Sequence, residues 1–354
     1  MDKIERKLLN LIQGTFPIHP EPYRILGESI GVSEEEVLAK VQHLYALGVI
    51  RRLGGVFDSR RLGYFSTLCT AKVPEDKISL VAGLLAKIPG VTHNYLRNHA
   101  YNIWFTLIAI SREQAENTLK GIREAAGIEV FSLPATKVFK IRVDFDMSQE
   151  KWLEKETEED IEGDIEEDIE EDVEIEEKVQ AGSFGVNPQL GKTPERGWQD
   201  EDRPLIRVLQ KDLPHERYPF AALARQIDWS EEKVIKRTEA LVRSAVIRRF
   251  GAVLRHQKAG FVANAMGVWQ VEEAKVLKVG EKMASFREVS HCYQRPTLSD
   301  WPYNLFTMIH GHTPENCQTI MEKIAGETGV TRYAMLFSQA ELKKSSMEYF
   351  AEEE

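Results

Sequence analysis

The sequence predicts an α+β protein built from two copies of one unit, each a winged helix-turn-helix followed by a ferredoxin-like βαββαβ domain. The first observation is a repeat: VIRRLGGV at residues 49–56 matches VIRRFGAV at 246–253, an offset of 197. The second is that both copies show the same order of helical and extended patterns. The third is an acidic stretch that separates them. Ungapped agreement over such a distance indicates a duplication.

Composition excludes several classes of protein. A chain of 354 residues, 42% hydrophobic and 29% charged, suits a globular protein with more than one core. It has no apolar run near the ~20 residues that cross a bilayer, and its charged N-terminus lacks a signal-peptide pattern. We therefore expect a cytoplasmic protein with no membrane partner. Cys69, Cys292 and Cys317 are too scattered for a disulfide framework or an intrinsic metal site.

The negative charge is concentrated between the copies. Residues 150–178 hold 17 acidic residues and 3 lysines, a charge of −14, so the remaining chain carries +4 of the net −10. Isoleucine or valine recurs there at a helical spacing, but like charges one turn apart oppose a helix. Low hydrophobicity with high charge favours disorder. We predict a flexible acidic linker at 148–200.

The first copy opens with a predicted helix-turn-helix domain at residues 1–57. Residues 2–13 have the spacing of an amphipathic helix, and a proline-rich turn ends it. A second helix at 24–30 stops at Gly31. Ser33 and Glu36 form a capping box that begins a third helix at 34–47. Residues 49–57 are then extended.

A ferredoxin-like domain is predicted next, at 58–147. Its strands are expected at 64–73, from His93 onward, at 102–110 and at 129–143, with helices at 75–87 and 112–126. The second copy repeats this plan as a helix-turn-helix domain at 201–254 and a ferredoxin-like domain at 255–354. There we predict strands at 261–271, 288–295, 303–310 and 330–337, helices at 272–284 and 314–326, and a C-terminal helix at 339–350.

Histidine, tyrosine and arginine cluster in HNYLRNHAYNIWF at residues 93–105. Read as one strand, its alternate side chains point to one face, because side chains alternate with period 2. These are His93, Tyr95, Arg97, His99 and Tyr101. Such a face is implausible in a core and indicates the wall of a pocket for a flat anion. The second copy has HCYQR at 291–295, so we expect the two strands to come together.

The whole pattern resembles known families. The helix-turn-helix with βαββαβ is similar to the Lrp/AsnC transcription regulators, with GVIRRLGGVFDSRRLGY in the place of their linker strand. Within that superfamily, the FP…PY insertion, the IRR-(L/F)-G element and the HxYxR…YN(I/L) motif resemble siroheme decarboxylase. That enzyme is usually two related subunits, and each copy resembles one of them. The chain is thus similar to a natural fusion of the pair.

The resemblance implies an enzyme of haem biosynthesis, a carboxy-lyase that converts two acetate side chains of siroheme to methyl groups and yields didecarboxysiroheme. The tetrapyrrole is its own electron sink and carries its own iron, so no cofactor of the protein is expected. The protein must supply cationic clamps for carboxylates, an acid and a dry cavity. Siroheme is accordingly the expected partner.

The candidate residues follow from this chemistry. Arginine pairs bidentately with carboxylate, and the expected clamps are Arg97 and Arg295, helped by Arg51, Arg52, Arg248 and Arg249. Histidine titrates near neutral pH, and the candidate proton donors are His93, His99 and His291, with His310 behind them. Either His99 or His291 would instead ligate the siroheme iron. Substrate hydrogen bonding or stacking is expected from Tyr95, Tyr101, Tyr293 and Tyr303.

Two other classes of function fit parts of the pattern. A ligand-responsive transcription regulator shares the fold, and a haem carrier shares the pocket. The third helix of the first copy opens with Glu34, Glu35 and Glu36, which would repel phosphate, whereas that of the second copy mixes acids with lysines. We expect no DNA partner. Which copy is productive, the order of the two decarboxylations and a higher homo-oligomer of the fused chain stay open.

Overall fold

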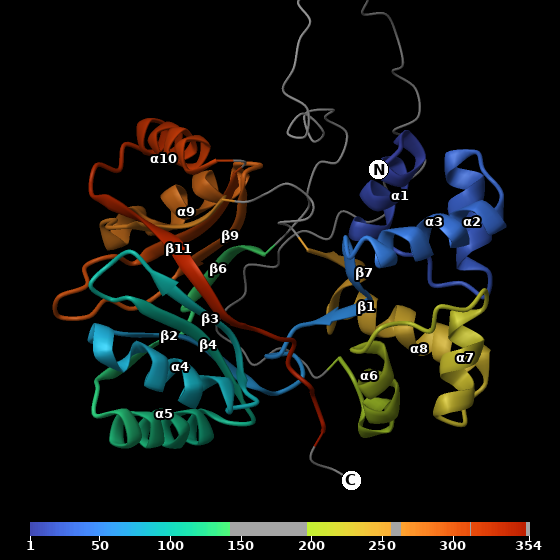
Figure 1. Ribbon diagram of the computed structural model, residues 1–354, viewed down its shortest axis with the longest axis horizontal. Coiled ribbons are helices and arrows are strands. Elements are labelled where there is room, and N and C mark those ends of the chain that lie inside the picture. Colours follow the sequence, from blue (N-terminus) through green and yellow to red (C-terminus); the bar gives the residue numbers. More distant parts are fainter. Residues whose placement is uncertain (142–196, 256–262, 312, 352–354) are drawn as a thin grey trace, which may run out of the picture.

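The computed structural model describes residues 1–141, 197–255, 263–311 and 313–351. The predicted linker at 148–200 lies outside these residues except for its last four. Figure 1 shows two lobes: a large sheet with helices on its outer face, and a helical lobe that faces the sheet's other side. Within the described ranges no helix is both long and apolar enough to span a membrane.

The helical lobe contains the helix-turn-helix part of both copies. Capping starts its third helices, since the hydroxyls of Ser33 and Ser230 accept hydrogen bonds from the amides of Glu36 and Lys233. A left-handed Gly31 ends the second helix of the first copy. Its α-helices within the described ranges are α1 (Lys3–Gly14), α2 (Pro22–Ile30), α3 (Glu34–Ala46), α6 (Arg203–Leu209), α7 (Pro219–Gln226) and α8 (Glu231–Arg243).

One hydrophobic core joins the two helix-turn-helix units. Leu8 and Leu44 of the first copy and Leu209 and Leu241 of the second are fully buried in a single cluster. Strand β1 (Ile50–Phe57) also pairs antiparallel with β7 (Ile247–Leu254), so a two-stranded ribbon spans the copies. Because burial of such side chains drives folding, neither unit has a separate core here.

The second lobe is a nine-stranded sheet in the order β5-β2-β4-β3-β11-β8-β10-β9-β6. In each copy the first four strands take the order fourth, first, third, second, which is the ferredoxin-like arrangement. This confirms the predicted fold class. The strands are β2 (Phe65–Ala71), β3 (Val91–Arg97), β4 (Ile103–Ala109), β5 (Val130–Leu133), β6 (Lys137–Ile141), β8 (Ala263–Trp269), β9 (Val289–Gln294), β10 (Leu305–Gly311) and β11 (Tyr333–Lys344).

Helices cover one face of this sheet, as Figure 1 shows. They are α4 (Ile78–Ala86), α5 (Arg112–Ala126), α9 (Val276–Ser285) and α10 (Pro314–Thr328), and short 3-10 turns precede α4, α6 and α9 at Glu75–Lys77, Asp200–Asp202 and Glu273–Lys275. The apolar stripes of these helices pack on two clusters, one in each copy. The opposite face is left for the helical lobe.

The copies exchange strands within the sheet. The first half of β11 pairs with β8 of its own copy, and its second half pairs with β3 of the first copy, which places Lys344 opposite His93. In return, β6 of the first copy pairs with β9 of the second. The predicted single strand at 129–143 is therefore two strands. Strand β5 pairs with β2 of its own copy, and β6 pairs with β9 of the second copy.

Two expectations about secondary structure are wrong. The C-terminal helix expected at 339–350 is not formed: residues 339–344 are the second half of β11, whose backbone completes the ladder with β3, and residues 345–350 are irregular. The strand expected from His93 through Tyr101 is also shorter than predicted. Strand β3 ends at Arg97, whose amide donates to the Asn102 carbonyl at 2.8 Å and closes a hairpin. Strands β3 and β9 are not neighbours, since β11, β8 and β10 lie between them.

Candidate active site

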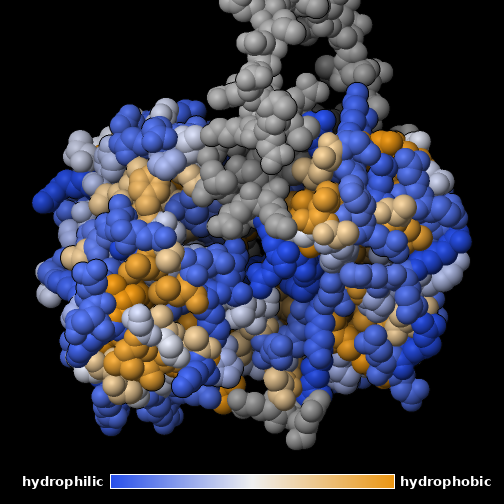
Figure 2. All heavy atoms as spheres, in the orientation of Figure 1, coloured by the Kyte–Doolittle hydropathy of each residue, from blue (hydrophilic) through white to orange (hydrophobic). Residues whose placement is uncertain are grey.

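A cavity of about 520 Å³ lies between the open face of the sheet and the β1–β7 ribbon. Residues of both copies line it, including strands β3 and β9, which are separated in the sheet but face the same space. Figure 2 shows hydrophilic residues along the seam between the lobes. The volume falls within the ~300–1,000 Å³ typical of small-molecule sites.

The lining is strongly basic. Seven cationic side chains face the cavity: Arg51, Arg60, Arg97, Arg248, Arg249, Arg295 and Lys344. Among the described lining residues Asp58 carries the one carboxylate, and it accepts hydrogen bonds from Arg60 Nε at 3.3 Å and Nη2 at 3.2 Å. A cavity with this charge balance suits a ligand that carries several carboxylates.

Arg97 and Arg295 occupy equivalent places in the two copies. Arg97 is buried and Arg295 is half-buried, and desolvation lowers the pKa of each guanidinium to about 10, which still leaves it charged at neutral pH. Their Nε atoms are buried without a hydrogen-bond partner. Each guanidinium also lies over the tyrosine two residues earlier, at 5.4 Å from the Tyr95 ring and 4.7 Å from the Tyr293 ring.

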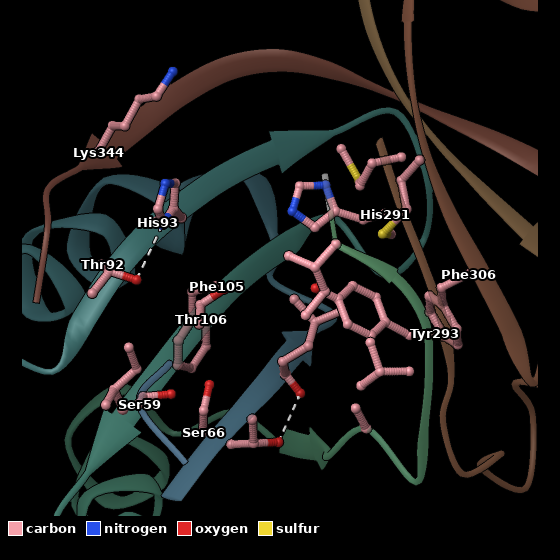
Figure 3. Close-up of a pocket in the computed structure, with 18 of the residues that line it drawn as sticks. Ser59, Ser66, Thr92, His93, Phe105, Thr106, His291, Tyr293, Phe306 and Lys344 are labelled. Carbon is pink, nitrogen blue, oxygen red and sulfur yellow. Dashed lines mark hydrogen bonds between the residues drawn. The ribbon is translucent and has the colours of Figure 1, made fainter. Parts of the chain in front are cut away.

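Three described imidazoles line the cavity, His93 from the first copy and His291 and His310 from the second, and Figure 3 labels His93 and His291. His93 Nδ1 lies 3.1 Å from Thr92 Oγ1, and His291 Nδ1 lies 2.9 Å from Ser290 Oγ. Both hydroxyl residues sit at irregularities in the strand register, where β3 and β9 each hold an extra residue. Neighbouring side chains in a regular strand point to opposite faces, so these bulges re-aim the pairs.

Burial keeps His93 and His291 neutral at neutral pH. It lowers the pKa of His93 to about 4, assisted by the charges of Lys344 and Arg51. It lowers the pKa of His291 to about 3, assisted by His310 and Arg248. In the same way burial raises the pKa of Tyr95 to about 12, so its phenol remains a hydrogen-bond donor.

The structure brings ten of the candidate residues to this cavity. Their shared feature is a side chain on the ribbon or on the open face of the sheet: Arg51, His93, Tyr95, Arg97, Arg248, Arg249, His291, Tyr293, Arg295 and His310. Four others do not line it, namely Arg52, His99, Tyr101 and Tyr303. Arg52 follows Arg51 on β1 and donates instead to the carbonyls of Gly55 and Lys211, at 3.1 and 3.3 Å.

His99 and Tyr101 lie outside the cavity because they are in the hairpin after β3 and not on the strand. The His99 ring packs on Trp301 at 5.2 Å, and Tyr101 donates to Asp300 at 2.7 Å. The Tyr303 ring also packs on Trp301, with 5.0 Å between the ring centroids. These residues therefore join the first-copy hairpin to the second-copy loop that precedes β10.

Sequence reasoning missed several lining residues. Arg60 stands in the quoted motif GVFDSRRLGY and has the right chemistry, so the motif itself was a signal. No sequence signal pointed to Lys344, because only the register of β11 against β3 places it beside His93. Thr92, which lines the cavity, and Ser290, which contacts the lining residue His291, gave no signal either, because a bulge cannot be seen in the alternation of side-chain types.

The fold and the cavity define a duplicated helix-turn-helix protein with an AsnC-like ligand-binding domain in each half. A model of the AsnC-like ligand binding domain matches residues 61–140 and 258–343, and a model of the siroheme decarboxylase NirDL-like HTH domain matches 5–51 and 202–248. The chain belongs to the siroheme decarboxylase family, which are carboxy-lyases.

Relatives match along the whole chain or along one copy. The siroheme decarboxylase of Hydrogenobacter thermophilus is 35% identical over 350 residues, 98% of this chain and 95% of the relative. The siroheme decarboxylase alpha subunit of Desulfovibrio desulfuricans is 56% identical over 151 residues, 42% of this chain and 87% of that subunit. The siroheme decarboxylase beta subunit of Methanosarcina barkeri is 42% identical over 146 residues, which are 41% of this chain and 96% of that subunit.

Solved structures agree with these matches. The crystal structure of siroheme decarboxylase NirDL covers 99% of this chain and 96% of its own, at 30% identity and a TM-score of 0.69. A second structure of NirDL holds an iron-uroporphyrin III analogue and has the same coverage, with a TM-score of 0.68. The likeness therefore extends over both copies.

Proposed function

We propose that this chain decarboxylates siroheme in the cavity between its two copies, giving didecarboxysiroheme. The observation that carries the proposal is the charge of the described lining, with seven cations and one carboxylate around one space that also holds the neutral imidazoles of His93 and His291. The iron-uroporphyrin III analogue in a similar structure supports a tetrapyrrole as the ligand. Such a ligand is flat and carries many carboxylates.

Each decarboxylation breaks the bond between the acetate methylene carbon and its carboxylate carbon. Carbon dioxide leaves, the electron pair passes into the macrocycle, and a proton then forms the new C–H bond of a methyl group. One proton is consumed for each acetate, so two are needed per siroheme. The protein must therefore hold the other carboxylates, exclude bulk water and deliver a proton twice.

Arg97 and Arg295 are the proposed carboxylate clamps, with the lining arginines of the ribbon beside them. Their buried, unpartnered Nε atoms fit this role, because a bound carboxylate would give each a partner. His93 and His291 are the proposed proton donors. In each, Nδ1 contacts a hydroxyl group, so Nε2 is the nitrogen that we propose faces the ligand. His99 is left out of the proposed machinery.

The low pKa values of His93 and His291 come from the protein's own surroundings. Neighbouring cations and burial both disfavour the imidazolium. A bound polycarboxylate supplies negative charge beside Arg51, Lys344 and Arg248, and so raises the pKa of His93 and His291 toward the ordinary range. Substrate binding in this way generates the imidazolium that acts as the acid. Before the substrate binds, the imidazoles are neutral.

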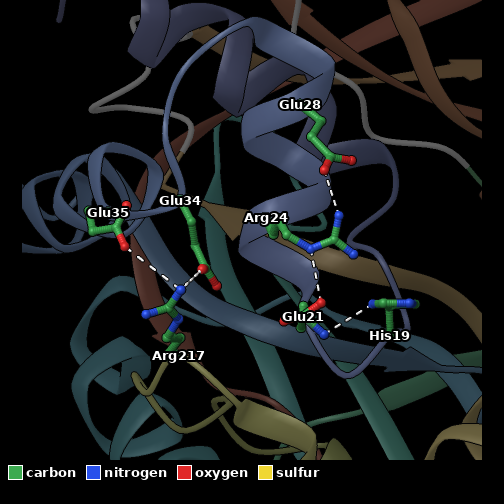
Figure 4. A network of polar contacts seen from close by, with 7 residues as sticks. All are labelled: His19, Glu21, Arg24, Glu28, Glu34, Glu35 and Arg217. Carbon is green, nitrogen blue, oxygen red and sulfur yellow. Dashed lines mark hydrogen bonds and ion pairs between the residues drawn. The ribbon is translucent and has the colours of Figure 1, made fainter.

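A DNA-binding regulator is the competing function, and the helix that would read DNA argues against it. In α3, Glu34 and Glu35 pair with Arg217 of the second copy, as Figure 4 shows. In α8, Lys236 pairs with Glu232 at 2.5 Å, and Arg237 pairs with buried Asp202 at 2.5 Å. Cations already paired with carboxylates contribute little to phosphate binding.

The test is an anaerobic incubation of the whole chain with siroheme, followed by mass spectrometry of the tetrapyrrole. The proposal expects loss of two carbon dioxide units per molecule. Unchanged siroheme that stays bound to the protein would mark a carrier. Tight, salt-dependent binding to promoter DNA without any decarboxylation would favour the regulator.

A further inference from the structure

The side chains that flank the cavity-facing histidines differ between the two copies. In the first copy, Lys344 of β11 lies opposite His93 of β3 on one side, and Thr106 of β4 lies opposite it on the other. Thr106 in turn lies opposite Leu68 of β2, and all four residues line the cavity. Figure 3 shows His93, Thr106 and Lys344 on this wall. Lys344, His93, Thr106 and Leu68 form the first-copy row.

The second copy has an apolar version of the same row. Ile141 of β6 lies opposite His291 of β9 on one side, and Met308 of β10 lies opposite it on the other. Met308 in turn lies opposite Met266 of β8, and all four residues line the cavity. Ile141, His291, Met308 and Met266 form the second-copy row.

The two rows occupy equivalent positions of the repeat. Thr106 and Met308 correspond, because each lies opposite the histidine of its row on the third strand of its ferredoxin-like domain. Lys344 and Ile141 correspond, because each lies opposite that histidine on a strand that crosses from the other copy. An ammonium and a hydroxyl group in the first-copy row are thus replaced by an alkyl group and a thioether in the second.

Polar side chains also occur near the second-copy row, one step along the strands. His310 lies opposite Asn264 in the next row. Its Nε2 lies 2.8 Å from Ser290 Oγ, which also lies 2.9 Å from His291 Nδ1 and 3.3 Å from the Met308 carbonyl. Ser290 is buried and does not line the cavity, so its hydroxyl group holds the imidazoles and not a ligand. A carboxylate seated in the second-copy row therefore meets apolar groups on both sides of the imidazole.

The cation of the first-copy row acts on its histidine. Lys344 Nζ pairs with Glu341 at 3.3 Å, and its charge adds to burial in lowering the pKa of His93. Both rows also face arginines of the β1–β7 ribbon, Arg51 on the first-copy side and Arg248 on the second. The difference between the two walls therefore lies in the sheet and not in the ribbon.

Decarboxylation is favoured by apolar surroundings of the leaving group. The acetate carboxylate holds a full negative charge, whereas the transition state moves that charge into the macrocycle and the carbon dioxide that leaves is neutral. Water or a hydroxyl donor stabilises the carboxylate more than the transition state, so removing such donors lowers the barrier. A carboxylate that must be kept needs a cation or a hydrogen-bond donor beside it.

We propose that the second-copy row is the subsite from which carbon dioxide leaves, and that the first-copy row binds a carboxylate that the product keeps. The bond between the acetate methylene carbon and its carboxylate carbon breaks there, and the electron pair passes into the macrocycle. His291, protonated on substrate binding, gives the proton of the new C–H bond. The inference rests on the proposed function and deepens it, because it assigns a different carboxylate to each wall of the cavity.

Both acetates use this one subsite in turn. The tetrapyrrole is therefore repositioned between the two steps, and His291 takes up a second proton from water during that repositioning. Any change that stabilises a carboxylate in the second-copy row should slow both steps alike. If each copy instead served one acetate, the same change would slow a single step.

The experiment places hydroxyl groups in the second-copy row. Met308→Thr installs the residue of the first copy, and Ile141→Thr adds a hydroxyl group at the other flank, on an edge strand where threonine favours β structure. Met308→Leu keeps an apolar side chain of similar size. Thr106→Met is the reciprocal exchange. Met335→Thr is the matched control, because Met335 is also a half-buried methionine on a strand and lies outside the lining.

Two quantities are measured for the whole chain and for each variant. The rates of the two losses of carbon dioxide come from anaerobic single-turnover reactions with siroheme at saturating protein, with mass analysis of quenched samples. The Kd for an iron-uroporphyrin comes from absorbance titration. Met308→Thr and Ile141→Thr should each slow both steps about tenfold, because the new hydroxyl group donates to the carboxylate before the bond breaks. Their Kd should be no more than about twofold larger than that of the wild type.

The other variants separate chemistry from packing. Met308→Leu should recover most of the rate, Met335→Thr should follow the wild type in rate and Kd, and Thr106→Met should raise the Kd about threefold because a hydroxyl donor is lost.

A wild-type rate in either Met308→Thr or Ile141→Thr would overturn the inference, and so would slowing of one step alone. Equal slowing in Met308→Leu, or a Kd that rises as much as the rate falls in Met308→Thr, would mark a packing role and overturn it as well. An unchanged Kd in Thr106→Met would contradict the role of the first-copy row. A wild type that leaves siroheme intact would instead reject the proposed function.

Discussion

Arg97 of the first copy donates from Nη1 to the backbone carbonyl of Leu336 in the second copy, at 2.8 Å. Arg295 returns the contact, since its Nη1 donates to the carbonyl of Leu133 in the first copy at 2.6 Å. Each proposed carboxylate clamp is thus fixed by a strand of the opposite copy. A single copy cannot hold its clamp in this way, which explains physically why the site needs both.

Replacing Arg97 by alanine should weaken binding of an iron-uroporphyrin about 10- to 100-fold, because a buried charge-assisted contact of about 1.5–3 kcal/mol is lost. Arg97→Lys should recover part of the affinity, since lysine keeps the charge and loses the planar fork. Titration by absorbance measures both. Arg52→Ala is the control, because Arg52 lies outside the cavity, and a loss of affinity there equal to that of Arg97→Ala would contradict the assignment.

Ligand binding at neutral pH should take up protons. The pKa values of about 4 for His93 and about 3 for His291 rise when bound carboxylates offset the neighbouring cations. Calorimetric titration with an iron-uroporphyrin in buffers of different ionisation enthalpy measures the number of protons. Uptake should fall in His93→Gln and in His291→Gln. Binding without any proton uptake in the wild type would count against the proposed acid.

Acid should destabilise the free protein partly through the same two histidines. Their folded-state pKa values lie below the ordinary 6.5, so the unfolded chain binds more protons as pH falls. Their contribution to stability is complete above about pH 6.5 and is lost as the pH falls toward 4. Between these two pH values, the free energy of unfolding of His93→Gln should fall by about 2–3 kcal/mol less than that of the wild type. Urea unfolding at each pH measures it, and parallel curves would contradict the claim.

His99→Ala should keep decarboxylase activity, because His99 packs on Trp301 outside the cavity. Tyr101→Phe should lower the free energy of unfolding by about 0.5–1.5 kcal/mol, since the hydrogen bond to Asp300 is lost. Rate measurements with siroheme, together with urea unfolding, separate the two effects. A large loss of turnover in His99→Ala at unchanged affinity would return His99 to the site.

The repeat and the element order were sufficient to predict the fold, because helix caps and hydrophobic spacing are local signals. Strand β11 was missed in its second half because its pairing with β3 is non-local. The residues of 339–344 favour a helix by composition, and the ladder with β3 outweighs that preference. Lys344 reaches the cavity through this same pairing.

The candidate site could be predicted where residue type alone decides it. Arg97 and Arg295 follow from their spacing in the two motifs, and Arg97 ends β3 while Arg295 directly follows β9. His99 lies outside the cavity because the chain turns into a hairpin after Arg97. The second copy has a proline-containing loop at the same place. The contact of Ser290 with two imidazoles depends on a bulge that sequence does not reveal.

The most direct measurement is the mass of siroheme after anaerobic incubation with the wild type and with His93→Gln/His291→Gln, both first checked for binding of an iron-uroporphyrin. The account predicts loss of two carbon dioxide units with the wild type and retention of both acetates with the double variant. Loss of both acetates at the wild-type rate with the double variant would contradict it.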